Sequence, residues 1–139
     1  MNFGFMLPSR GPLSQPENLS VIAKRGEELG YSFMMFPDHI VMPRDVSSRY
    51  PYTNSGVFPG TDTGETMEQL TTLAFLAGQT STIRLVTSVM VVPHRSPVAT
   101  AKVLSTLDIL SRGRLTVGVG TGWLEEEFLA LETKPFAQR

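Results

Sequence analysis

The stretch IRLVTSVMVVPHRSPVATAKVLSTLDILSRGRLTVGV, residues 83–119, decides the fold class. Residues 83–91 are almost continuously apolar, as expected for a strand covered on both faces. Ser96 and Pro97 then predict a helix start, with serine as the cap and proline at the first helical position. Apolar residues follow at helical spacing, and residues 114–119 are a second apolar run. The stretch therefore predicts a strand, a helix and another strand.

The same alternation extends toward the N-terminus. Residues 2–7 form a short apolar run, and residues 14–17 have the S-x-x-E form of a capping box. This box predicts the start of a helix, and Gly30 is placed to end it. Residues 31–36 form the next predicted strand, and residues 65–79 form the next helix.

A glycine turn, residues 120–122, leads into a fourth helix that we predict over residues 123–131. Glu125, Glu126 and Glu127 lie in its first turn, where the positive end of the helix dipole favours carboxylates. Four strand–helix units in succession indicate an α/β protein with parallel strands and right-handed crossovers. The pattern leaves two architectures open, an open doubly wound sheet and the N-terminal half of a TIM (β/α)8 barrel.

The connection after the second strand, about residues 37–64, is unusually long for a compact domain. It is polar, contains proline and glycine, and carries Tyr50, Tyr52 and Phe58. One interpretation is a lid whose aromatic rings close over a planar cofactor. The other is a loop whose aromatic side chains pin it to the surface.

Composition excludes several classes of function. A net charge of -1 favours neither nucleic acid nor an anionic membrane as a partner. The chain has no cysteine and only two histidines, so we expect no disulfide and no histidine- or cysteine-based metal site. There is no P-loop or nucleophile-elbow motif. We see no signal peptide or membrane span and expect a cytoplasmic protein.

Ligands of either architecture bind at the carboxyl ends of the strands. Asp38 and His39 follow the second strand there, and histidine can donate or accept a proton near neutral pH. Neighbouring residues of an extended segment point opposite ways, so direct pairing of the two is not assured. The alternative is a capping aspartate beside a surface histidine. We interpret His94 as an exposed loop residue.

The turn VGVGTGW after the fourth strand is not a dinucleotide fingerprint, because Trp123 occupies the third glycine position. Its glycines either let backbone amides approach a flat ligand or simply pack a tight turn.

Together the segments FPDH (36–39), LTTLAFLAGQTSTIR (70–84), VTSVMVVPHRSPVATAK (86–102), LDILSRGR (107–114) and VGVGTGWLEEEF (117–128) resemble the luciferase-like monooxygenase superfamily. Within it the chain is most similar to the F420-dependent oxidoreductases. The resemblance implies a (β/α)8 barrel with an isoalloxazine-type ring over the strand ends. It implies catalytic roles for Asp38 and His39 beside the ring, with Asp38 also holding the cofactor.

The resemblance also implies a non-proline cis peptide at Ser88 and Val89, which forms a bulge behind the ring. It places the turn residues Gly120, Thr121 and Gly122 against the cofactor. Sugar-phosphate dehydrogenases of the family have a proton-donating glutamate where this chain has Trp123, so we do not carry that donor over. Trp123 and Tyr50 are candidates for the substrate pocket, and a plain core role for Trp123 is equally open.

Our leading functional prediction is hydride transfer between coenzyme F420 and a small organic substrate. The first alternative is an FMN-dependent monooxygenase that uses reduced flavin and O2, with the 37–64 loop shielding the site from water. The second is an inactive half-barrel that serves as an assembly unit. Family members have eight strands, so we expect a missing C-terminal half or a homo-oligomer.

Overall fold

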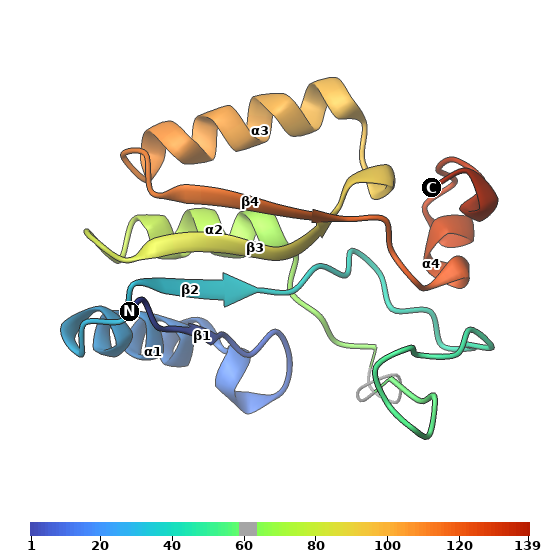
Figure 1. Ribbon diagram of the computed structural model, residues 1–139, viewed down its shortest axis with the longest axis horizontal. Coiled ribbons are helices and arrows are strands. Elements are labelled where there is room, and N and C mark those ends of the chain that lie inside the picture. Colours follow the sequence, from blue (N-terminus) through green and yellow to red (C-terminus); the bar gives the residue numbers. More distant parts are fainter. Residues whose placement is uncertain (59–63) are drawn as a thin grey trace.

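The computed structural model describes residues 1–58 and 64–139. Within these residues all predicted strands and helices are present, in the predicted order (Figure 1). They are β1 (Gly4–Met6), α1 (Pro16–Glu28), β2 (Phe33–Phe36), α2 (Gln69–Ala77), β3 (Arg84–Val91), α3 (Pro97–Leu110), β4 (Leu115–Gly120) and α4 (Glu125–Ala130), with 3-10 turns η1 (Pro12–Ser14), η2 (Val92–His94) and η3 (Phe136–Gln138). None of the helices in these residues is long and apolar enough to cross a membrane.

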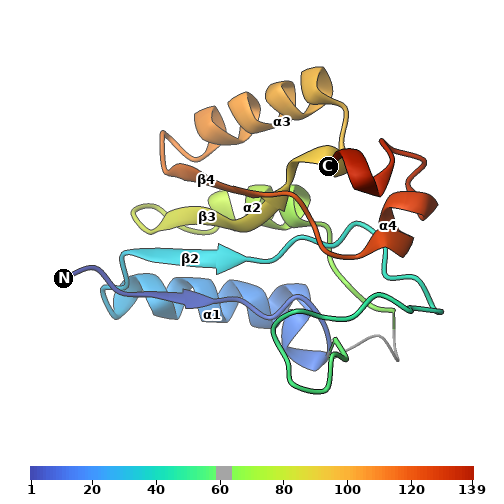
Figure 2. The same ribbon diagram turned by 45° about the vertical axis from the view of Figure 1, so that its right-hand side comes forward.

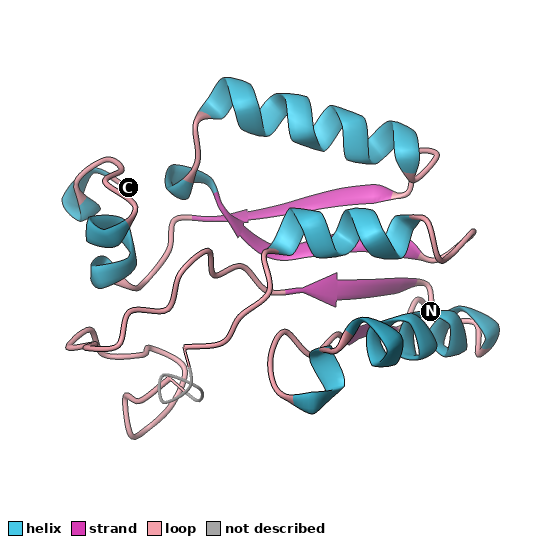
Figure 3. Cartoon of the chain, turned by 180° about the vertical axis from the view of Figure 1, so that it is seen from behind, coloured by secondary structure: helices cyan, strands magenta, loops and turns pink. Residues whose placement is uncertain are grey.

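The strands form one parallel sheet in the order β1-β2-β3-β4. Helices α1 and α2 lie in front of the strands in Figure 3. Leu107 of α3 shares one core cluster with Leu19 of α1 and Leu73 of α2, so the three helices pack on the same face of the sheet. An open doubly wound sheet reverses its strand order and carries helices on both faces. A (β/α)8 barrel adds each strand beside the previous one and keeps the helices outside. The fold is therefore the N-terminal half of a TIM barrel.

The hydrophobic core lies between the sheet and its helices. Met34 and Phe36 of β2 are fully buried on the helix side of the sheet. They belong to one cluster with Leu19 of α1, Leu73 of α2 and Leu107 of α3. Complete burial of one such side chain stabilises the fold by about 1.5–3 kcal/mol. This packing fixes the positions of the strand ends, where the site lies.

The start of α1 differs from the prediction, because residues 14–17 do not form a capping box. The helix begins at Pro16, and no side chain caps it. The hydroxyl of Ser14 donates instead to the carbonyl oxygen of Gly11, at 2.8 Å. Proline favours the first helical position, so Pro16 starts the helix one residue too late for Ser14 to be its cap. The prediction for Gly30 is confirmed, since it follows the last turn of α1 with a φ of 80°.

The long connection after β2 is confirmed where the structure describes it, because residues 37–58 and 64–68 contain no helix or strand. Helix α2 begins later than the predicted residue 65, and Glu68 is its cap, accepting a hydrogen bond from the backbone of Thr71 at 2.7 Å. Residues 59–63 of the predicted lid lie outside the described residues. Figures 1 and 2 place this connection and α4 beyond the carboxyl ends of the strands.

Candidate functional site

A pocket of about 490 Å³ opens at the carboxyl ends of β1, β2 and β3. The loop after β2 supplies a further wall, and the segment after β4 contributes Trp123. Residues that the sequence singled out as site candidates share this lining: Asp38, His39, Tyr50, Ser88, Val89 and Trp123. They come from distant parts of the chain, and the parallel order of the strands brings them together.

The peptide bond between Ser88 and Val89 is cis, as the family resemblance predicts. The pairing of β3 with β4 shifts register between Thr87 and Met90, so the strand bulges at this point. Val89 remains 44% exposed and lines the pocket. The bulge therefore places an apolar side chain in the pocket wall.

The glycine turn after β4 lies behind this bulge. A Cβ atom on Gly120 would come within 2.6 Å of Val89 Cγ2. A Cβ atom on Gly122, whose φ is 83°, would come within 2.9 Å of the side chains of Val91 and Phe128. Both distances are shorter than ordinary contacts, so close packing accounts for the two glycines. Gly120, Thr121 and Gly122 do not line the pocket, and their contact with a cofactor stays a prediction.

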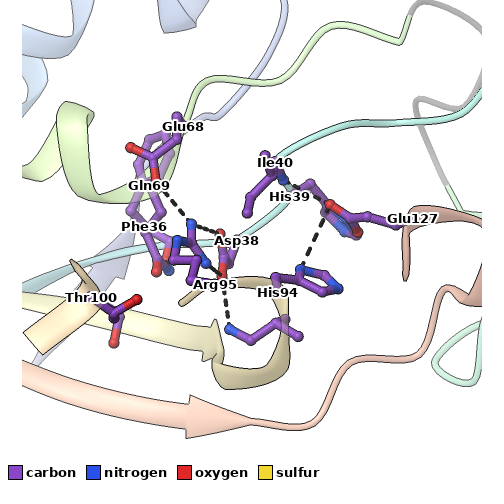
Figure 4. A network of polar contacts seen from close by, with 12 residues as sticks. Phe36, Asp38, His39, Ile40, Glu68, Gln69, His94, Arg95, Thr100 and Glu127 are labelled. Carbon is purple, nitrogen blue, oxygen red and sulfur yellow. Dashed lines mark hydrogen bonds and ion pairs between the residues drawn. The ribbon is translucent and has the colours of Figure 1, made fainter. Parts of the chain in front are cut away.

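The carboxylate of Asp38 is fully buried and is held by Arg95 in a two-point ion pair. Arg95 Nη1 donates to Oδ2 at 2.6 Å and Nη2 donates to Oδ1 at 2.7 Å. The backbone N–H of Val91 also donates to Oδ2, at 2.8 Å. Burial would lower the pKa of Arg95, but its bonds to Asp38 and Glu68 raise it, so the guanidinium stays charged. Asp38 thus ties the end of β2 to the end of β3 (Figure 4).

His39 points away from Asp38 and toward α4. Its Nδ1 lies 2.9 Å from Oε2 of Glu127, whose side chain is only 1% exposed. Oε1 of Glu127 accepts the backbone N–H groups of Ile40 at 2.7 Å and Val41 at 3.1 Å. Figure 4 shows this cluster separate from the contacts of Asp38. The expectation that Asp38 and His39 need not pair is confirmed.

Glu127 was missed at the sequence level. The helix dipole explained all three glutamates of the LEEEF segment equally, but the structure gives them different surroundings. Glu125 and Glu127 have equivalent spacings from the buried residues Leu124 and Phe128, yet only Glu127 is buried. The local sequence therefore held no signal that singles it out.

Glu126 holds the loop after β2 at a second point. Its Oε1 accepts hydrogen bonds from the backbone N–H and the hydroxyl of Ser47, both at 2.7 Å, and from the backbone N–H of Ser48 at 2.9 Å. Burial would raise the pKa of Glu126, but these donors lower it to about 2. Two consecutive carboxylates of α4 therefore fasten the loop over the strand ends.

His94 is not an exposed loop residue, so that prediction is wrong. It is 5% exposed, because η2 turns its ring beneath α4, where it packs edge-on against Phe128 with centroids 4.6 Å apart. Its Nδ1 lies 3.9 Å from Oε1 of Glu127, too far for a hydrogen bond. Burial lowers the pKa of His94, although Glu127 and Asp38 act in the opposite direction.

Aromatic rings from the loop meet Trp123 on one side of the pocket. Tyr50 lies 4.9 Å from both Phe58 and Trp123, measured between ring centroids, and Phe58 lies 5.6 Å from Trp123. The ring of His39 lies 5.0 Å from that of Phe58. Such spacings are typical of aromatic packing. The loop aromatics therefore form a wall of the pocket together with Trp123, which is not an isolated core residue.

The family model for luciferase-like monooxygenases matches residues 1–139. The chain belongs to this family. An uncharacterized protein of Mycobacterium tuberculosis is 36% identical over 118 residues, which are 85% of this chain and 41% of that protein. The phthiodiolone/phenolphthiodiolone dimycocerosates ketoreductase of Mycobacterium bovis is 32% identical over an alignment of 147 positions, which covers 99% of this chain and 38% of the relative. The chain thus spans well under half the length of these relatives.

Solved structures agree with this luciferase-like assignment. Monooxygenase RslO1 from Streptomyces bottropensis is 28% identical with a TM-score of 0.65, over 95% of this chain and 36% of that one. The F420-dependent tetrahydromethanopterin reductase of Methanopyrus kandleri is 23% identical (TM-score 0.64; 94% and 30% covered). The FMN-bound 3,6-diketocamphane monooxygenase component of Pseudomonas putida is 18% identical (TM-score 0.67; 94% and 32% covered). The last two likenesses concern the fold alone.

Proposed function

We propose that residues 1–139 form the N-terminal part of an oxidoreductase that transfers a hydride between coenzyme F420 and a small organic molecule. The observation that carries the proposal is the meeting of His39, the β-bulge with Ser88 and Val89, and an aromatic wall around one pocket. Apolar and aromatic walls of this kind suit a flat ring system. The similar fold of the F420-dependent reductase supports this choice of coenzyme.

When bound, the coenzyme would supply or accept the hydride. His39 would move the accompanying proton or stabilise charge, since its ring borders the pocket and imidazole titrates near neutrality. The ketoreductase relative supports a carbonyl substrate. With a carbonyl substrate, His39 protonated on both ring nitrogens would give its Nε2 proton to the carbonyl oxygen as the carbon takes up the hydride. With an alcohol substrate, neutral His39 would accept the hydroxyl proton at Nε2.

The remaining candidates would shape and hold the site. Asp38, neutralised by Arg95, would keep the ends of β2 and β3 together. Ser88 and Val89 would form the wall behind the ring, and the turn 120–122 would contact the coenzyme. Trp123 and Tyr50 would line the substrate side of the pocket.

An FMN-dependent monooxygenase is the second candidate. The similar fold of the FMN-bound diketocamphane monooxygenase supports it. The wall of Tyr50, Phe58 and Trp123 would exclude water from a reduced flavin that reacts with O2. The same pocket serves both candidates, so the coenzyme distinguishes them.

The test is to titrate the complete gene product with F420 and with FMN, and to follow the absorbance and fluorescence of each coenzyme. Tighter binding of F420, followed by its reduction or oxidation in the presence of carbonyl or alcohol substrates, supports the proposal. Tighter binding of FMN, with substrate-dependent consumption of O2, favours the second candidate. Binding of neither coenzyme leaves the third prediction, an inactive assembly unit.

A further inference from the structure

We propose that Glu127 is a positioning residue that holds His39 as the tautomer with its proton on Nδ1 and leaves Nε2 to serve the pocket. The proposed function assigns proton movement to His39, so the effect of Glu127 on catalysis rests on that proposal. The inference about the tautomer rests on the contacts of Glu127 alone.

The hydrogen bonds around Glu127 determine which atoms carry protons. Oε1 is occupied by two backbone donors, from Ile40 and Val41. Oε2 lies 2.9 Å from Nδ1 of His39. An ionised carboxylate only accepts hydrogen bonds, so Nδ1 must be the donor in this contact. A neutral imidazole has one N–H, and Nε2 is then its free acceptor.

The surroundings keep Glu127 ionised. Burial would raise its pKa, but the hydrogen bonds from His39 and from the backbone N–H of Val41 are among the contacts that lower it overall. A buried carboxylate with three donors is a fixed acceptor rather than a proton store. Its function is therefore to orient its partner.

Glu127 also places the ring in space. It comes from α4, 88 residues along the chain from His39, and it grips the backbone just after the histidine as well as the ring itself. Glu126 has the same charge and neighbouring position, but it holds only Ser47 and Ser48. Glu126 thus fastens the loop, and Glu127 orients His39. Because the two glutamates are adjacent and carry the same charge, Glu126→Gln is a matched control for Glu127→Gln.

The experiment is nitrogen-15 NMR of the histidine rings in the complete gene product labelled at histidine. Residues 1–139 contain only two histidines, and the signal lost in His39→Asn assigns the ring of interest. We expect a protonated Nδ1 and an unprotonated Nε2 for His39 in the wild type. Glu127→Gln should convert this into a mixture of tautomers, and Glu126→Gln should leave it unchanged.

A wild-type His39 with its proton on Nε2 would overturn the inference; the tautomer is read on the wild-type protein, and His39→Asn serves only to assign the signal. An unchanged tautomer in a folded Glu127→Gln protein would overturn it as well. Turnover adds a second readout: Glu127→Gln should lower kcat by up to about 10²–10⁴-fold, the range of general acid–base catalysis, with KM changed less than about twofold. If the tautomer is as expected but the wild type neither reduces nor oxidises F420 with any carbonyl or alcohol substrate, the proposed function fails and the positioning by Glu127 stands.

Discussion

His39 is the residue on which the proposed chemistry depends. Its ring borders the pocket, and Nδ1 is engaged by Glu127. We predict that His39→Ala lowers kcat by about 10²–10⁴-fold, the usual contribution of a proton-transferring group. Binding of the coenzyme should change little, because the walls of the pocket remain. Single-turnover absorbance measurements of the coenzyme check both statements.

The control for this variant is Ser55→Ala, on the same loop but outside the pocket lining. It should keep turnover within about twofold of the wild type, as expected of an exposed side chain far from the reacting atoms. Equal activity of His39→Ala and Ser55→Ala would remove His39 from the mechanism.

Asp38 belongs to the framework of the site. Asp38→Ala would leave the buried guanidinium of Arg95 with only Glu68 as a partner. Breaking a buried ion pair from one side costs about 3–5 kcal/mol of unfolding free energy, and we expect a loss of about 3 kcal/mol because Glu68 remains. Urea unfolding of the variant and of the wild type measures this loss. Glu28→Ala, which removes the exposed partner of Arg25, should cost less than about 1 kcal/mol, and equal losses would contradict this assignment.

The sequence located pocket residues where they follow the end of a strand. It failed for residues whose surroundings depend on tertiary packing. Asp38 and His39 followed from their place after β2, because the carboxyl ends of parallel strands collect ligands. His94 and Glu127 were misread, since their surroundings depend on how α4 packs against η2 and the loop. No local pattern around His94 or Glu127 contains that information, since the exposed Glu125 is spaced equivalently from the buried residues Leu124 and Phe128.

At the scale of the elements, periodicity predicted every strand and helix but not all of their ends. Pro16 rather than Ser14 sets the start of α1, and Glu68 caps α2 later than predicted. Ser96 does occupy the N-cap of α3, although its hydroxyl makes no cap hydrogen bond. Ends of helices depend on single hydrogen bonds worth about 1 kcal/mol, whereas their existence depends on a whole apolar face.

A carboxylate also connects two elements at the opposite end of the sheet. Glu27 of α1 accepts backbone hydrogen bonds from residues leading into β3, including Ser81 at 2.9 Å and Ile83 at 2.9 Å. Burial would raise the pKa of Glu27, but these donors lower it from 4.5 to about 2. Because the pKa is lower in the folded state, this stabilisation is complete above pH 4.5 and is lost as the pH falls toward 2.

We therefore predict that Glu27→Gln lowers the unfolding free energy by about 1 kcal/mol at pH 7, the low end for bonds to a charged group at a partly exposed site. The difference from the wild type should shrink between pH 4.5 and pH 2. Glu126 titrates in the same window, so the comparison between variant and wild type, measured by urea unfolding at several pH values, isolates Glu27. A difference that is constant with pH would refute the assignment.

At the scale of the whole molecule, the sequence left the choice between a doubly wound sheet and a barrel open. Periodicity reports which residues are buried, but it does not report which strands are neighbours. The order β1-β2-β3-β4 and the single layer of helices decide the choice. This order also places β1 and β4 at the two edges of the sheet, where the barrel would continue.

The edge strand β4 carries exposed apolar side chains. Val117 is 38% exposed and Val119 is 60% exposed, although both belong to an apolar strand. Open edges with apolar side chains promote association with other chains.

We predict that residues 1–139, produced alone, show a mass in light scattering above the 15.3 kDa of the monomer. Val119→Lys should shift the mass toward that of the monomer, while Val98→Lys, at an 80% exposed position at the start of α3, should not. A folded monomer at micromolar concentration in the unmodified chain would show instead that the half-barrel tolerates its open edge.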